Sequence, residues 1–153
     1  MKVFVPKEIS NKIFLAVKKS GLNEIKGALF AEKKDDNCFQ IEDVYIGNEI
    51  GTTVFSRLTV NARYKTFKRK YFKKHNKDYI NHNYIGDWHS HPLFKCVPSD
   101  YDKKELIDEL KNSNALFLIQ VILKIENERL CGNCFYCNKN DYCIKKCDLI
   151  LEQ

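Results

Sequence analysis

Residues 87–102 read Asp-Trp-His-Ser-His-Pro-Leu-Phe-Lys-Cys-Val-Pro-Ser-Asp-Tyr-Asp. The stretch opens with an H-x-H pair, His89 and His91, and closes with an S-x-x-D pair, Ser99 and Asp102. Two imidazoles and a carboxylate can supply three protein ligands to a zinc ion, and a catalytic zinc needs three such ligands and an open fourth position. Because side chains two apart on a strand point to the same side, the two histidines at a strand end would face one cavity.

The same stretch has a simpler structural interpretation. Ser99-x-x-Asp102 before an apolar-periodic segment is a capping-box pattern, so Ser99 can serve only to begin a helix. Paired histidines can also be ordinary polar residues. Against this, Pro92 stops ladder pairing after the histidines and turns the chain, which lets the next helix bring Asp102 back to them. The combination favours a zinc site over either half taken alone.

The elements around this stretch indicate a mixed α/β fold. We expect helices over residues 6–20, 61–74 and 100–111, the first ended by Gly21 in a left-handed cap. We expect strands over 26–32, 38–46, 52–60, 82–89 and 115–125, followed by a hairpin of 128–136 with 142–151. Helices interspersed with mostly hairpin-linked strands predict a mixed sheet flanked by helices. The chain shows no internal repeat or linker, so residues 1–153 are expected to form a single domain.

Composition narrows the class of protein. The chain has 153 residues, of which 44% are hydrophobic and 30% charged, the balance of a globular protein. No apolar run approaches the ~20 residues of a membrane span, and the start lacks a signal-peptide core. We therefore expect a cytoplasmic protein that does not bind membranes.

A run of basic side chains lies between Lys65 and Lys77 and accounts for much of the net charge of +6. Such a run is compatible with nucleic acid or an acidic protein partner. However, Tyr64, Phe67 and Tyr71 recur at helical spacing, which leaves the lysines for the outer face of a solvated helix. We favour the solvated face and do not expect nucleic acid as the partner.

The C-terminal part is rich in cysteine. Cys131, Cys134, Cys137 and Cys143 could bind a second zinc or an iron–sulfur cluster. Yet the C-x-x-C spacing lies in a strand pattern rather than in a tight knuckle, and cysteine also serves as a small buried hydrophobe. We favour simple core or surface cysteines. The seven cysteines of the chain are expected to be reduced or metal-bound, with Cys137 near Cys143 across the hairpin.

Residues 89–92 together with 99–102 resemble the JAMM motif of the JAB/MPN zinc metalloproteases. The resemblance implies a JAB1/MPN fold, similar to that of cytidine deaminases, and a zinc held by His89, His91 and Asp102. Members also carry a catalytic glutamate upstream, at the edge of an early strand. Glu24, followed by Ile-Lys-Gly-Ala-Leu-Phe, fits that place, whereas its rivals Glu32 and Glu42 do not precede the strand. Departures from the family pattern are Ala31, where a glycine often ends the strand, and the cysteine-rich tail.

The resemblance also implies an activity. Glu24 would take the proton from the attacking water, and Ser99 would donate to the oxyanion. The bond cut would be an amide or isopeptide that follows the C-terminal tail of a ubiquitin-like or similarly conjugated protein, the tail lying extended beside a sheet edge. The short chain is similar to stand-alone prokaryotic deubiquitinase-like members, some of which belong to CBASS-type antiviral operons. Alternatives are a processing peptidase for a ubiquitin-like or sulfur-carrier precursor, and a non-catalytic MPN scaffold.

Overall fold

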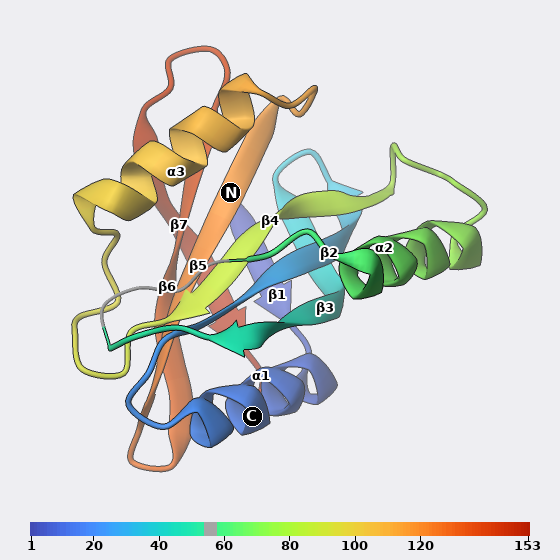
Figure 1. Ribbon diagram of the computed structural model, residues 1–153. Coiled ribbons are helices and arrows are strands. Elements are labelled where there is room, and N and C mark those ends of the chain that lie inside the picture. The colour runs from blue at the N-terminus through green and yellow to red at the C-terminus, as the bar shows by residue number, and fades with distance from the viewer. Residues whose placement is uncertain (54–57) are drawn as a thin grey trace.

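The computed structural model describes residues 1–53 and 58–153, which form three helices and seven strands (Figure 1). The elements are β1 (Lys2–Val5), α1 (Lys7–Ser20), β2 (Ile25–Asp35), β3 (Cys38–Ile50), α2 (Ala62–Lys74), β4 (His82–Ser90), α3 (Asp100–Lys111), β5 (Phe117–Glu126), β6 (Arg129–Asn138) and β7 (Ile144–Leu151). The fold is therefore mixed α/β, as predicted.

The strands follow the order β1-β3-β2-β4-β5-β6-β7, and the sheet closes on itself. Closure depends on β1, which pairs in parallel with both β3 and β7. This short strand was not predicted from the sequence. β4 and β5 also pair in parallel, connected through α3, whereas β2 pairs antiparallel with β3 and β4. β4, which carries His89 and is followed directly by His91, thus lies between two other strands.

Apolar layers cover both faces of the central strands because side chains alternate along a strand. On β2, Leu29 and Ala31 join the core beneath α1, whereas Ala28 and Phe30 join a second core beneath α2. α1 buries Ile9, Ile13 and Val17 in the first core. Each such side chain contributes about 1.5–3 kcal/mol on burial. The three helices lie at separate places around the sheet (Figure 1).

The predicted helices are confirmed, with one difference in detail. α1 ends at Ser20, and Gly21 donates its N–H to the carbonyl of Lys18. Gly21 has a φ of 65° but a ψ of −123°, so the cap is not the left-handed helical conformation that was expected. α2 begins after Asn61, whose side chain accepts a hydrogen bond from the N–H of Tyr64.

α2 turns its aromatic side inward. Tyr64 and Tyr71 are buried, and Phe67 packs against them, as its helical spacing predicted. The basic side chains of the helix are exposed: Lys65, Lys68, Arg69, Lys70, Lys73 and Lys74. No helix among the described residues is long and apolar enough to cross a membrane.

The strand expected over residues 52–60 is not found in its described part. Residues 52–53 and 58–60 are irregular, and residues 54–57 lie outside the described residues. The connection between β3 and α2 passes beside Glu24, where Gly51 donates to the Glu24 carbonyl and the Glu24 N–H donates to Thr52. β3 is correspondingly longer than predicted and extends to Ile50.

A β-bulge in β4 sets the direction of the two histidines. The pairing with β2 shifts register between Leu29, opposite Gly86, and Phe30, opposite Tyr84, so Ile85 is extra. Gly86 has a φ of 141°, and a Cβ there would lie 1.9 Å from the carbonyl oxygen of Ile119. Only glycine suits this combination of backbone conformation and close approach.

Candidate metal centre

Three side chains converge where β4 ends and α3 begins. The Nε2 atoms of His89 and His91 are 3.1 Å apart. Asp102 places Oδ1 3.4 Å from His89 Nε2 and Oδ2 3.7 Å from His91 Nε2. The structure therefore brings together the three residues that the sequence proposed as metal ligands, and all three are buried.

The geometry of this cluster fits a zinc ion. Tetrahedral zinc with bonds of about 2.0–2.2 Å places neighbouring ligand atoms about 3.3 Å apart. The distances of 3.1 Å between the two histidine nitrogens and 3.4 Å from His89 Nε2 to Asp102 Oδ1 lie close to that value, and one ligand atom of each of the three residues lies within 4.8 Å of the others. Two imidazoles and one carboxylate are also a donor set that zinc accepts in catalytic sites, where a fourth position stays open.

The backbone near His91 fixes the orientation of its ring. His91 Nδ1 lies 3.0 Å from the carbonyl oxygen of Lys95, which can only accept a hydrogen bond. The proton is thereby assigned to Nδ1, and the Nε2 lone pair faces the cluster, as in metal-bound histidines. Asn133 on β6 supports the same loop by donating to the carbonyl of Cys96 over 2.8 Å.

Asp102 is both a candidate metal ligand and part of the helix cap, the two interpretations of the S-x-x-D pattern. Its Oδ2 accepts hydrogen bonds from the Ser99 N–H at 2.7 Å and from the Ser99 hydroxyl at 2.6 Å. Ser99 Oγ in turn accepts from the Asp102 N–H at 3.2 Å, which completes a capping box. The helix cap and the candidate ligand set thus share one carboxylate, and the cap holds that carboxylate in place.

Glu24 is the carboxylate that lies beside this cluster. It is buried, and its Oε1 is 3.7 Å from His91 Nε2. Ser90, between the two histidines, accepts a hydrogen bond from the Ile25 N–H at 3.0 Å and so ties the start of β2 to the end of β4. The two other glutamates considered as the general base lie elsewhere. Glu32 pairs with Lys34, and Glu42 contacts a different pair of histidines.

Burial and charge act against each other in this site. Burial raises the pKa of Glu24, and the two nearby histidines only partly oppose it. Burial would raise the pKa of Asp102 as well, but hydrogen bonds and charge from His89 and His91 hold it well below its usual range. A carboxylate that stays ionised suits a ligand, whereas one with a raised pKa suits a group that exchanges protons.

A buried ion cluster next to the site was not foreseen from the sequence. The Lys26 ammonium lies 2.8 Å from Asp87 Oδ2 and also contacts Glu105 of α3. Burial would lower the pKa of Lys26, but the two carboxylates more than compensate and raise it above its usual value. Lys26 lies opposite His89 in the pairing of β2 with β4, so the cluster joins α3 to the strands that carry the site.

The cysteines of the tail are spread along a strand. Cys134 belongs to the core beneath α1 and Cys137 to the core beneath α3, on opposite sides of the sheet. Cys131 and Cys137 are six positions apart on β6, a distance of about 20 Å. Among the described residues, no group of three or more possible metal ligands includes a cysteine. Cys137 pairs with Ile144, next to Cys143, in agreement with the expected hairpin.

Comparison with known proteins shows a family and a fold for this chain. The family described as prokaryotic homologs of the JAB domain matches residues 6–131. A solution structure of a protein from Desulfitobacterium hafniense has a TM-score of 0.67 at 18% identity, with 99% of this chain and 93% of that chain covered. A solution structure from Salinibacter ruber has a TM-score of 0.59 at 16% identity, with 100% and 92% covered. At these identities the two structures show a shared fold alone. No curated protein matches the chain.

Proposed function

The chain belongs to the family of prokaryotic homologs of the JAB domain, and we propose that it is a JAMM-type zinc-dependent peptidase that hydrolyses an amide or isopeptide bond. One observation carries this proposal. His89, His91 and Asp102 converge with zinc-like spacing, and a buried glutamate lies 3.7 Å from one of them. A non-catalytic scaffold of the same fold would have no need of this combination.

The residues divide the reaction between them. A zinc ion held by His89, His91 and Asp102 would supply Lewis-acid activation of water and of the scissile carbonyl. Glu24 would accept the proton of the attacking water and return it to the leaving amine, a task for which its raised pKa is suited. Ser99 is exposed at the start of α3, and its hydroxyl donates a hydrogen bond to Asp102. After rotation away from Asp102, the hydroxyl would donate a hydrogen bond to the developing oxyanion.

The proposed substrate is the C-terminal tail of a ubiquitin-like or similarly conjugated protein. Beyond Gln40, β3 pairs with no described strand except β2, so its outer edge is available near Ile50. Ile50 lies opposite Ile25, the residue after Glu24. An extended tail paired with this edge would reach the site through backbone hydrogen bonds, the recognition mode of strand addition.

The proposed setting is deconjugation in a reducing compartment, the cytoplasm, with CBASS-type antiviral operons as the specific case. All seven cysteines are unpaired, including Cys134 and Cys147, which lie opposite each other on β6 and β7. A conjugating enzyme and a nucleotidyltransferase encoded beside this chain would support the antiviral setting. Their absence from the neighbouring genes would favour the processing of a precursor instead.

Substitution of Glu24 tests the activity. We expect Glu24→Gln to abolish cleavage of a folded ubiquitin-like protein fused through its tail, while the zinc held by His89, His91 and Asp102 remains bound, because a general base is not a ligand. The double variant His89→Ala/His91→Ala should lose both that zinc and the activity. Glu32→Gln, on the same strand but away from the site, is the matched control and should behave as the unmodified chain. Full activity of Glu24→Gln would refute the assigned role, and a chain inactive under all conditions would favour the scaffold.

A further inference from the structure

A second group of possible metal ligands lies at the other end of β4. Glu42 on β3, His75 at the end of α2 and His82 at the start of β4 place one ligand atom each within 4.8 Å of one another. His82 and His89 stand near opposite ends of the same strand, about 20 Å apart. This group is therefore separate from the candidate active site.

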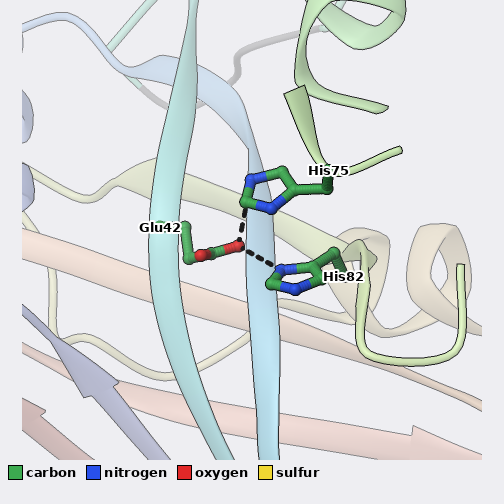
Figure 2. Close-up of side chains that lie close together, drawn as sticks. All are labelled: Glu42, His75 and His82. Carbon is green, nitrogen blue, oxygen red and sulfur yellow. Dashed lines mark hydrogen bonds and ion pairs between the residues drawn. The ribbon is translucent and has the colours of Figure 1, made fainter. Parts of the chain in front are cut away.

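Figure 2 shows the two imidazoles on the same side of Glu42, with dashed lines that join both of them to the same carboxylate oxygen, Oε2. His82 Nδ1 lies 2.8 Å and His75 Nε2 3.5 Å from Glu42 Oε2. The rings stack, with centroids 4.0 Å apart and planes inclined by 19°. Both nitrogens lie close to Glu42 Oε2, and tetrahedral zinc asks for ligand separations of about 3.3 Å. Because the lone pair of an imidazole nitrogen lies in the ring plane, at least one of the two stacked rings must rotate when an ion binds to both.

One of these nitrogens has no hydrogen bond. His75 Nε2 is buried, and its approach to Glu42 lacks hydrogen-bond geometry. Buried polar atoms are nearly always paired with a protein group, a water or an ion. A buried nitrogen that has no hydrogen bond and lies close to two other possible metal ligands therefore indicates a missing partner. A cation between His75, His82 and Glu42 would satisfy it.

The Glu42 carboxylate is also held by a hydrogen bond from a neighbouring side chain, as metal-ligating carboxylates usually are. The Tyr71 hydroxyl donates a hydrogen bond to Glu42 Oε2 over 2.7 Å, and ligating carboxylates are commonly held by such neighbours. Tyr71 lies one helical turn before His75, and the His75 N–H bonds back to the Tyr71 carbonyl. The end of α2 thereby presents one candidate ligand and the residue that orients another.

We propose that Glu42, His75 and His82 form a second binding site for a zinc-like divalent metal ion, which fastens the end of α2 to β3 and β4. Three protein ligands leave a position for water, and the side chains retain 17%, 12% and 19% exposure, so the ion can enter from solvent. Imidazole and carboxylate donors suit first-row divalent ions of the zinc type better than magnesium or calcium, which prefer oxygen alone.

The chain offers an unusually clean test, since it contains only four histidines. In the variant His89→Ala/His91→Ala, the remaining histidines are His75 and His82, so every imidazole NMR signal belongs to this site. We expect titration with zinc chloride to shift the ring ¹⁵N signals of both residues with a stoichiometry of about one. Adding Glu42→Gln should weaken this binding by about 10-fold or more, as loss of a ligand does.

A second variant, which changes His75 and His82 and keeps His89 and His91, tests the site even if His89→Ala/His91→Ala fails to fold. His75→Gln/His82→Gln in the otherwise intact chain should lower the zinc content by about one equivalent and reduce the rise of Tm with added zinc, without affecting peptide hydrolysis. That last result separates this site from the proposed active site. Ring signals that stay unmoved by zinc in His89→Ala/His91→Ala would overturn the proposal and leave a hydrogen-bonded Glu–His cluster. Equal zinc content in His75→Gln/His82→Gln and the unmodified chain would overturn it as well and would point to the cysteines.

Discussion

The N–H of Ile25 donates a hydrogen bond to the hydroxyl of Ser90 over 3.0 Å. This contact joins the residue after the candidate general base to the residue between the two candidate zinc ligands. Both partners are buried, so no water replaces the bond when it is lost. The position of Glu24 relative to His89 and His91 therefore depends on Ser90, a residue with no chemical role of its own.

Ser90→Ala should slow hydrolysis while zinc remains bound. The substitution leaves the Ile25 N–H without a partner, which costs about 1–3 kcal/mol of stability, and frees the segment that carries Glu24. We expect a fall in kcat with little change in KM, measured on a tail-fused substrate alongside zinc content. Ser10→Ala is the control, since Ser10 is buried near the start of α1 and its hydroxyl donates a hydrogen bond to the carbonyl of Val5. Equal kcat in the two variants would show that Ser90 does not position the base.

Ser99→Ala should have two separable effects. Loss of the helix cap should lower the free energy of unfolding by about 0.5–2 kcal/mol. Loss of the oxyanion donor should lower kcat by roughly 10²-fold or more. Asn61→Ala removes the cap of α2 and should reproduce the first effect without the second. If Ser99→Ala lost stability but retained its rate, Ser99 would be a cap only.

Lys26→Met should destabilise the protein strongly. It leaves the buried carboxylate of Asp87 without its cation, and breaking a buried pair in this way costs about 3–5 kcal/mol. Chemical denaturation measures the loss. Asp87→Asn in the Lys26→Met background should recover part of it, because the uncompensated charge is then removed. Lys103→Met, which breaks an exposed pair with Asp100, should change stability little.

Much of this architecture could be predicted because the signals are local. Helix spacing, the capping pattern at Ser99 and the H-x-H pair each lie within a few residues of chain. The centre formed by His89, His91 and Asp102 was accessible for the same reason. Glu24 was accessible only through resemblance, since its place directly before a strand points to a role only beside the family pattern.

What escaped prediction depends on contacts between distant segments. Glu42, His75 and His82 share no spacing motif. The pairing of β3 with β2 and of β2 with β4 brings Glu42 near His82, and the packing of α2 on these strands adds His75. The short strand β1 closes the sheet through neighbours at both ends of the chain. The bulge at Gly86 likewise arises from close approach to Ile119, for which an isolated glycine gives only a weak hint.

The stability of the fold should depend on pH through Glu109. Burial raises the pKa of this carboxyl, the charge of Asp87 raises it further, and the hydrogen bond from Tyr84 opposes the change only in part. Because the folded-state pKa is the higher one, the contribution to stability is present below the unfolded value and is lost as pH rises through the folded one.

Glu109→Gln should remove this dependence. The amide oxygen can still accept from Tyr84, and the amide does not ionise. The free energy of unfolding of the variant, relative to that of the unmodified chain, should therefore rise from below pH ~4.5, the ordinary value for glutamate, towards neutrality. Denaturation of both proteins over this range measures the difference. A difference that is constant with pH would contradict the raised pKa.

Selectivity for a folded partner should reside beside the metal centre rather than on the basic helix. The loop that follows His91 exposes Leu93, Phe94 and Val97, at 53%, 50% and 52% exposure. Apolar side chains grouped in this way mark a surface for protein contact. α2, the helix that carries the exposed lysines, lies instead towards the start of β4 and away from its other end (Figure 1).

Leu93→Asp/Phe94→Asp should raise KM for a ubiquitin-like protein fused through its tail and leave kcat unchanged, as loss of uniform binding does. The same variant should cleave a free tail peptide as well as the unmodified chain does, because the peptide lacks the folded domain. Charge reversal of Lys68 and Arg69 is the matched control and should change only the salt dependence of binding to the fusion. If the control raised KM more than Leu93→Asp/Phe94→Asp, α2 would be the docking surface. Equal kcat/KM for fusion and peptide in the unmodified chain would favour a general peptidase that recognises the tail alone.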